Sequence, residues 1–241
     1  PVNGMYTKIF VAGRAGIDRY ARNGVEIAES KFELIGRPQA HLINVQATSW
    51  QSVDHPKVLF APTWGGSALG ESYSSLSIAS QIIEQLIARG AAITFRPHPF
   101  SYRTAEGRAQ IAAAQELLKQ HESSRHVGHR WGASAERELS AVDCVNGCDL
   151  LISDVSGIVS DWLYSLKPFL LVSMDLNAQE FANQYPVASG GLILEAKVDG
   201  AVSESIAALL TQDKLLDERR RVRDYYIANA ADADLSERFV S

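Results

Sequence analysis

His98 lies between two prolines in the run Arg96-Pro97-His98-Pro99, directly after an apolar stretch whose pattern predicts a β-strand. Each proline fixes its own φ angle and disfavours the helical conformation in the residue before it, so this loop is stiff. An imidazole held rigidly at the end of a strand can donate to a phosphate or act as a general acid. Arg96 adds a planar guanidinium that suits a phosphate. A stiff loop with an exposed histidine is the alternative interpretation.

The stretch from Asp149 to Gly157 (Asp-Leu-Leu-Ile-Ser-Asp-Val-Ser-Gly) predicts a buried strand, a tight turn over 154–157 and a helix from about Ile158. Free backbone N–H groups and the positive end of the helix dipole point into such a turn and favour an anion. We therefore expect the turn, with Asp154, Ser156 and Gly157, to hold a phosphate or diphosphate. The alternative is an ordinary turn in which Ser156 caps the helix.

Two further positions have side chains suited to a nucleotide. Asp161 lies about one turn into the predicted helix, where a carboxylate could accept hydrogen bonds from ribose hydroxyls. The alternative is a solvated carboxylate that only favours the helix dipole. Pro62 and Thr63 begin a glycine-rich loop after another predicted strand, and its glycines permit close backbone approach to a ligand. This loop lacks the Gly-Lys-Ser/Thr of a Walker loop and the Gly-x-Gly-x-x-Gly typical of NAD sites.

Strands and helices alternate from about residue 55 to 230, which predicts a Rossmann-like parallel sheet of right-handed βαβ units. Ligands bind such sheets beyond the carboxyl ends of the strands, so loops 62–72, 96–101 and 154–157 are selected. We expect strands at 57–61, 91–95, 125–127, 150–153, from 169 and at 191–194. We expect helices at 75–89, 104–120, 135–146, from about 158, at 198–210 and at 214–228.

The first part of the chain has a different organisation. A strand at 7–13, a helix at 14–23 and a strand at 31–35 precede a polar stretch, 39–56, that resembles a linker. We therefore expect one region over 1–54 and a nucleotide-binding domain over 55–241. The chain begins with Pro1 instead of Met, so we expect it to be a piece of a longer protein.

Composition excludes several classes of function. The 241 residues are 46% hydrophobic and carry a net charge of −5, which argues against general nucleic-acid binding. No apolar run approaches the roughly 20 residues of a membrane span, and no signal peptide is visible. Cys144 and Cys148 have no nearby further ligands, so we expect buried reduced thiols of a cytosolic domain and no zinc site. We expect no tightly bound cofactor and no metal cluster, while a diffusible Mg²⁺ is compatible with the sequence.

Together these loops resemble the C-terminal domain of the CDP-glycerol:poly(glycerophosphate) glycerophosphotransferases, the teichoic-acid primases and polymerases. Order and spacing agree over about 200 residues. The matching segments are Leu59-Phe-Ala-Pro-Thr-Trp64, Arg96-Pro-His-Pro99, Asp149 to Gly157 continuing to Asp161 and Lys167-Pro168, a variant turn Gly36-Arg37-Pro38, and the tail from Ala231 to Phe239.

The resemblance implies the C-terminal half of a GT-B fold, which binds the nucleotide donor, here CDP-glycerol. Residues 1–54 would then be the end of the N-terminal domain and the linker. By the same resemblance, His98 acts at the donor diphosphate, the turn with Ser156 and Gly157 holds phosphate, and Asp161 holds the ribose. Arg96, Pro62 and Thr63 would line the pocket.

The resemblance also implies an acceptor that is a polyol-phosphate or glycan polymer of the cell wall or capsule, and no nucleic-acid partner. It places the enzyme in the cytoplasm, with the inner face of the plasma membrane reached through the full-length protein. Two departures matter: Gly157 replaces the second serine of the family's turn, and the Trp-His-Gly-Thr-like segment thought to supply the general base is absent. Two alternatives stay open, namely a UDP-sugar glycosyltransferase or UDP-GlcNAc 2-epimerase, and a non-catalytic nucleotide-binding domain.

Overall fold

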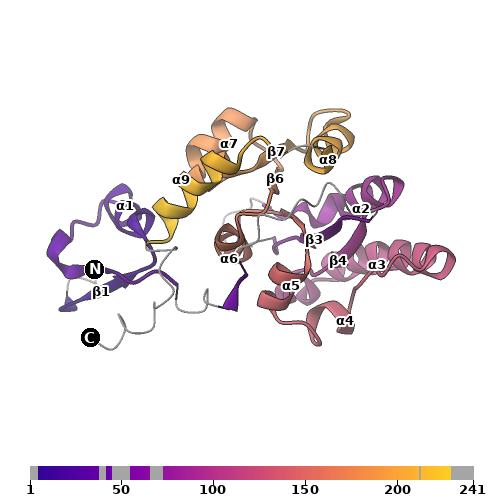
Figure 1. Ribbon diagram of the computed structural model, residues 1–241, viewed down its shortest axis with the longest axis horizontal. Helices are drawn as coiled ribbons and strands as arrows, with labels where there is room; N and C mark the ends of the chain where they lie inside the picture. Colours follow the sequence, from indigo (N-terminus) through magenta and orange to yellow (C-terminus); the bar gives the residue numbers. More distant parts are fainter. Residues whose placement is uncertain (1–4, 38–41, 45–54, 66–72, 212, 229–241) are drawn as a thin grey trace.

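A five-stranded parallel sheet with the order β4-β3-β5-β6-β7 forms the centre of the protein in this computed structural model (Figure 1). The structure describes residues 5–37, 42–44, 55–65, 73–211 and 213–228. Residues in β5 and β6 are buried throughout, as expected for central parallel strands that are covered on both faces. The strands are β3 (Lys57–Ala61), β4 (Ala92–Phe95), β5 (Leu150–Ser153), β6 (Phe169–Ser173) and β7 (Leu192–Glu195).

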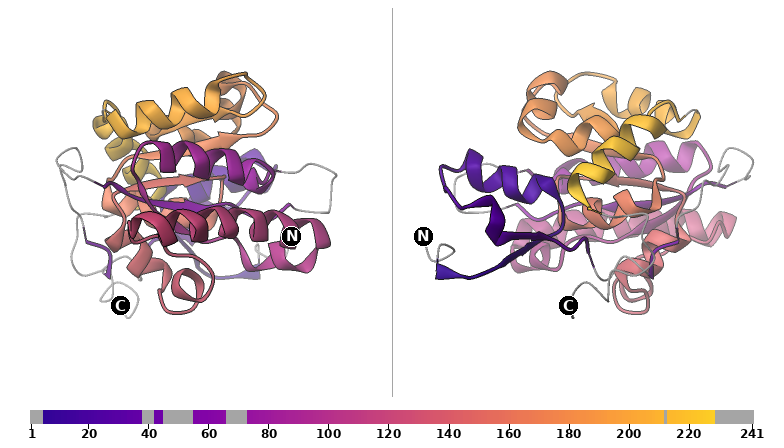
Figure 2. Two further views of the ribbon diagram at one scale, coloured as in Figure 1. Left: turned by 90° about the vertical axis from the view of Figure 1, so that its right-hand side faces the viewer. Right: turned by 60° about the vertical axis from the view of Figure 1, so that its left-hand side comes forward.

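Helices cover both faces of this sheet, and alternate residues of each strand face the two helical layers (Figure 2). Val58 and Phe60 pack in the core beneath one layer, whereas Leu59 and Ala61 pack beneath the other. The first layer contains α2 (Ala79–Ala88), α3 (Ala105–Arg125) and α8 (Ala201–Thr211). The second contains α5 (Ala141–Gly147), α6 (Gly157–Ser165), α7 (Ala178–Gln184) and α9 (Leu216–Tyr226).

The strand order places the topological switch point of the sheet between β3 and β5, and the opening expected there is called the crevice. Strand β4, which follows β3 in the chain, lies next to β3 in one direction along the sheet. Strand β6, which follows β5, lies next to β5 in the opposite direction. Connections that diverge in this way leave an opening at the carboxyl ends of the two strands, where α/β proteins bind their ligands. The loops that follow β3 and β5 therefore border this opening.

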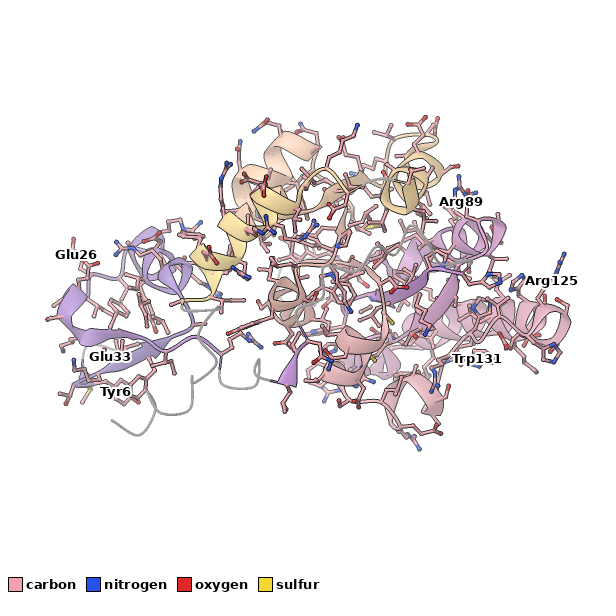
Figure 3. The ribbon with its side chains drawn as sticks, in the orientation of Figure 1. Tyr6, Glu26, Glu33, Arg89, Arg125 and Trp131 are labelled. Atoms are coloured by element: carbon pink, nitrogen blue, oxygen red, sulfur yellow. The ribbon has the colours of Figure 1, made fainter. Side chains whose placement is uncertain are left out.

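A smaller unit at the start of the chain contains β1 (Ile9–Val11), α1 (Arg14–Arg22) and β2 (Phe32–Leu34), with the two strands parallel. The end of α9 reaches this unit, because the N–H of Ala228 donates to the carbonyl of Ala12 at 2.8 Å. Gly13 is needed here, since a Cβ atom would lie 2.4 Å from the backbone of Tyr226. Figure 3 places Glu26 and Glu33 on this unit, at the end of the molecule opposite Arg125.

Most predicted elements are present, and the differences have local causes. The predicted strand at 125–127 is wrong, because α3 continues to Arg125 and His126 takes a left-handed conformation (φ 52°). Instead, Arg130 forms an isolated bridge with Thr94 of β4. The predicted helix 135–146 is two helices, α4 (Ala133–Glu136) and α5, since Ser140 starts α5 with a capping box. Helix α7 was not predicted.

Two predictions concern residues that the structure does not describe or describes only in part. Most of the linker 39–56 and the glycine-rich end of loop 62–72 lie outside the described residues, so the division at residue 54 stays a prediction.

In the described ranges, no helix combines the length and apolar character needed to cross a bilayer.

Candidate functional site

The loops that follow β3, β4 and β5 are joined at the crevice by one backbone hydrogen bond and one hydrogen bond to a side chain. The N–H of His98 donates to the carbonyl of Pro62 at 3.0 Å. The N–H of Thr63 donates to Asp154 Oδ2 at 2.7 Å. Three of the predicted site segments, distant in sequence, therefore meet at one end of the sheet, as the strand order requires.

Asp154 lies beneath this crevice and holds two of its walls together. Its side chain is 1% exposed and accepts hydrogen bonds from the N–H groups of Thr63 (2.7 Å) and Ser75 (3.1 Å). Burial raises the pKa of Asp154 to about 7, although these hydrogen bonds oppose the increase. Because both carboxyl oxygens of Asp154 accept from backbone N–H groups, this side chain fixes the turn 154–157 against the loops of Thr63 and Ser75.

His98 is held in one tautomer when it is neutral. Its Nδ1 accepts a hydrogen bond from the N–H of Phe100 at 3.1 Å, at the start of the 3₁₀ helix η6 (Pro99–Arg103). The proton of the neutral ring therefore lies on Nε2, which becomes a donor. The ring stacks on Trp64 at 6.3 Å and meets Phe100 edge-on at 5.1 Å. Partial burial lowers the pKa of His98, which favours the neutral form.

Ser156 and Gly157 form the beginning of α6, at the β5 side of the crevice. Ser156 occupies the N-cap position but makes no side-chain capping hydrogen bond. Its hydroxyl instead lies 3.2 Å from the hydroxyl of Ser153. A Cβ atom added to Gly157 would meet nothing within 4 Å, so there is open space beside the first turn. The simple capping interpretation of Ser156 is therefore wrong, and the backbone donors of this turn suit an anion.

Arg96 does not line the crevice, which corrects the sequence prediction. Its Nη1 donates to the backbone carbonyls of Ala135 and Leu139, the latter at 2.9 Å. The guanidinium therefore faces α4 and α5 and fixes the segment between them. A phosphate contact was predicted because the sequence shows only that Arg96 follows a strand, and it does not show which carbonyls lie nearby.

Asp161 is present on α6, one turn from Gly157, but it already has a cationic partner. Its Oδ1 lies 2.6 Å from Nη2 of Arg37, and both side chains are partly buried. Burial raises the pKa of the Asp161 carboxyl, and the neighbouring guanidinium opposes that increase. The proposed contact with a ribose stays a prediction. Local sequence patterns do not indicate this ion pair, because its partners lie 124 positions apart in the chain.

An apolar cavity of about 230 Å³ adjoins the crevice and shares Thr63 with it. Aromatic side chains provide much of its wall, namely Trp64, Tyr73, Phe181 and Tyr185. Such a cavity suits a flat ring, because aromatic faces stack on bases with little dependence on sequence. Phe181 was not predicted as part of this site, because helix α7 was not predicted. The start of α7 is polar and is capped by Asn177 and Glu180.

Comparison with known proteins now gives the family. The model of the CDP-glycerol:poly(glycerophosphate) glycerophosphotransferase family matches residues 45–241. The chain belongs to this family. A comparison with the sequences of curated proteins gives no match.

Solved structures share the fold of this family member at low identity. The wall teichoic acid polymerase TagF superposes with a TM-score of 0.55 at 14% identity, covering 97% of this chain and 54% of that one. A putative UDP-N-acetylglucosamine 2-epimerase from Listeria monocytogenes gives 0.59 at 11% identity, with 98% and 58% covered. The S. aureus MnaA–UDP structure gives 0.56 at 15%, with 97% and 58% covered. The chain thus spans little more than half of each of these proteins, and the predicted α/β Rossmann-like fold is confirmed.

The described part of this family member contains no group of three or more His, Cys, Asp or Glu side chains that could hold a metal ion. Cys144 and Cys148 are buried free thiols, as predicted. Burial raises the pKa of Cys148 to about 12, so this thiol stays protonated at neutral pH.

Proposed function

We propose that this chain is the donor-binding part of a transferase that uses a CDP-activated polyol phosphate of the CDP-glycerol type. The transferred glycerol phosphate would extend a teichoic-acid or related cell-wall or capsule polymer. The observation that carries the proposal is the open, uncapped start of α6 at Ser156 and Gly157. His98, whose Nε2 is a donor, lies in a loop at the same end of the sheet. Backbone donors and an imidazole donor at one end of a sheet suit the diphosphate of a nucleotide.

Each part of the donor has a position in this proposal. The diphosphate lies at the first turn of α6, and the base enters the aromatic cavity that Trp64 and Tyr185 line. Pro62 and Thr63 form the boundary between the two compartments, since Thr63 lines the cavity and its N–H is fixed by Asp154. A compartment for charge beside one for an aromatic ring is the pattern that nucleotides require.

In the reaction, an acceptor hydroxyl attacks the β-phosphorus of the donor. A new bond forms between that oxygen and phosphorus, the bond from the β-phosphorus to the bridging oxygen breaks, and CMP leaves with this oxygen. The neutral His98 donates its Nε2–H to the oxygen on which negative charge develops, while α6 stabilises the phosphate charge. This chain therefore supplies positioning and charge stabilisation, and the base that accepts the hydroxyl proton lies elsewhere in the full-length protein. A diffusible Mg²⁺ bound to the donor phosphates is compatible with this scheme.

We also propose that the enzyme acts in the cytoplasm, at the inner face of the plasma membrane. The arginine run of α9 contributes little to membrane attachment, because most of its side chains have local acidic partners. Arg220 pairs with Asp217 and Arg221 with Glu218, each at 2.8 Å. The arginine run of α9 is therefore not part of the proposed membrane contact.

A UDP-GlcNAc 2-epimerase activity is the second candidate, favoured by the similarity of the fold to the Listeria structure. Such enzymes carry further acidic and arginine side chains after the helix that corresponds to α6. Here Glu180 lies in that region, but its carboxylate accepts from the N–H of Asn177 and caps α7. A third candidate is a nucleotide-binding domain without catalytic activity, which would be favoured if the full-length protein also lacked the N-terminal histidine segment.

Thermal unfolding in the presence of nucleotides separates these candidates. A ligand that binds only the folded state raises its stability by about RT ln(1 + [L]/Kd), which is about 2.7 kcal/mol at 100 times Kd. We expect CDP and CDP-glycerol to raise the melting temperature of this chain more than UDP or UDP-GlcNAc at equal concentration. Equal shifts, or larger shifts with the uridine compounds, would contradict the donor assignment.

A further inference from the structure

One face of α6 carries Gly157, Asp161 and Tyr164, and Arg37 of the N-terminal unit lies along it. The spacing of these three positions, four and then three residues, places them on the same side of a helix. The backbone N–H of Arg37 donates to the Tyr164 hydroxyl at 3.0 Å, and that hydroxyl lies 3.4 Å from the Arg37 carbonyl. The position of the Arg37 backbone is therefore fixed relative to α6.

Within the part of the chain that the structure describes, the guanidinium of Arg37 is only partly engaged. Its Nη2 contacts a single oxygen of Asp161, Oδ1, at 2.6 Å. Its Nε is buried and has no hydrogen-bond partner among the described residues. A buried donor of a cation without an acceptor is unfavourable, and the planar guanidinium normally holds an anion through two parallel bonds. Arg37 therefore has capacity for a second anionic partner.

There is open space beside Gly157, at the first turn of α6. Gly157 is one helical turn, about 5.4 Å, from Asp161, and a side chain at Gly157 would meet nothing within 4 Å. A phosphate at the first turn of α6 would thus lie within reach of a long side chain held at Asp161. Other polar groups of the crevice do not supply a positive charge there, because Arg96 binds the carbonyls of Ala135 and Leu139 and His98 favours its neutral form.

We infer that Arg37 is a phosphate-binding residue that Asp161 holds in position beside the start of α6. When a nucleoside diphosphate occupies the crevice, the guanidinium extends along the open face over Gly157 and donates to the phosphate. Asp161 then orients Arg37 and does not bind the ribose. Because Arg37 belongs to the N-terminal unit and the phosphate to α6, binding also ties the two parts of the chain together. This inference rests on the proposed nucleotide site.

Calorimetric titration of the 241-residue chain with cytidine, CMP and CDP tests the inference. Arg37→Ala should lower CDP affinity at least tenfold, CMP affinity less, and cytidine affinity by less than twofold. Arg37→Lys should recover part of the loss, because it keeps the charge but not the planar pair of donors. Asp161→Asn should lower CDP affinity, but less than Arg37→Ala does, because Arg37 keeps its charge and loses the carboxylate that orients it. Cytidine affinity should not change in this variant. Arg19→Ala, at an exposed arginine of α1, is the matched control expected to retain CDP affinity.

Different results overturn different parts of the argument. Unchanged CDP affinity in Arg37→Ala overturns the inference alone. An equal loss for cytidine and CDP in that variant, with an unchanged melting temperature, also overturns it, because Arg37 would then act by placing α6. An equal loss of all three ligands in Asp161→Asn would assign Asp161 to the ribose. If the wild-type chain binds neither CMP nor CDP, the proposed function fails, and the inference fails with it.

Discussion

The charge state of Asp154 gives the sharpest prediction about how the crevice is built. Asp154→Asn keeps the shape of the side chain and one acceptor for the two backbone donors, but it cannot ionise. An exposed aspartate has a pKa near 3.9, whereas burial raises the pKa of Asp154 to about 7 in the folded protein. Between these values the folded state binds the extra proton, so the contribution of Asp154 to wild-type stability falls as pH rises from about 4 to about 7. The asparagine variant lacks this loss.

The size of the effect follows from the same pKa difference. Each pKa unit corresponds to about 1.36 kcal/mol, so the wild type should lose about 3 kcal/mol relative to the variant between pH 5 and 7.5. A constant penalty of about 1–3 kcal/mol opposes this gain, because one of the N–H groups of Thr63 and Ser75 loses its acceptor. Asp154→Asn should therefore be the less stable protein at pH 5 and approach or exceed the wild type at pH 7.5.

Urea unfolding followed by circular dichroism at pH 5, 6, 7 and 7.5 measures both effects. Asp143→Asn is a suitable control, because that exposed carboxylate caps α5 and hydrogen bonds from Ser140 lower its pKa. A lowered pKa contributes stability that is lost only as pH falls below about 4, so the control should show no trend over this range. If the free energy of unfolding of the wild type increased relative to that of Asp154→Asn as pH rises, Asp154 would not be a buried carboxyl with a raised pKa.

Three further predictions concern other parts of the structure. His98→Gln should keep more CDP affinity in calorimetry than His98→Ala, because an amide N–H can replace the Nε2–H of the imidazole. In the full-length enzyme, His98→Ala should abolish transfer without unfolding the protein, and near-normal transfer rates would remove His98 from the mechanism. His129 Nδ1 accepts from the N–H of Ile93 at 3.0 Å and burial lowers the His129 pKa, so the urea midpoint of the wild type should fall relative to that of His129→Asn as pH drops below about 6.5. Equal pH dependence of the two proteins would assign the slope to other groups. Lys167→Met should lower the free energy of unfolding by about 3 kcal/mol, since its Nζ donates to three carbonyls at the end of α5, whereas CDP affinity should not change. A tenfold loss of CDP affinity would contradict this purely structural role.

Local patterns in the sequence were sufficient for the sheet. Strands β3 and β5 are short apolar runs bounded by turn residues, and both lie where they were predicted. The rule that ligands bind beyond the carboxyl ends of parallel strands then predicts from the sequence that the loops of Pro62, His98 and Gly157 lie at one end of the sheet. The start of α3, capped by Thr104, was also predicted within a residue.

Contacts between distant residues were not predictable in the same way. Arg96 and Asp161 have ordinary local sequences, and only the folded chain shows that carbonyls near α4 engage one and Arg37 engages the other. The role of Asp154 likewise depends on two N–H groups about 80 to 90 residues away. A charged side chain pairs with the groups that tertiary packing places near it. The positions of these residues in the fold were therefore predicted better than their interactions.

The central claim is that a nucleoside diphosphate binds at the start of α6, beside His98, in the crevice between β3 and β5. Titration of the ¹⁵N-labelled chain with CDP, followed by amide and imidazole nuclear magnetic resonance, tests it most directly. We predict saturable shifts that are largest for the amides of Gly157 and Ile158 and for His98 Nε2, with Thr63 also affected. Shifts confined to residues away from the crevice, for example around Leu215 and Arg219 at the opposite edge of the sheet, would contradict the account.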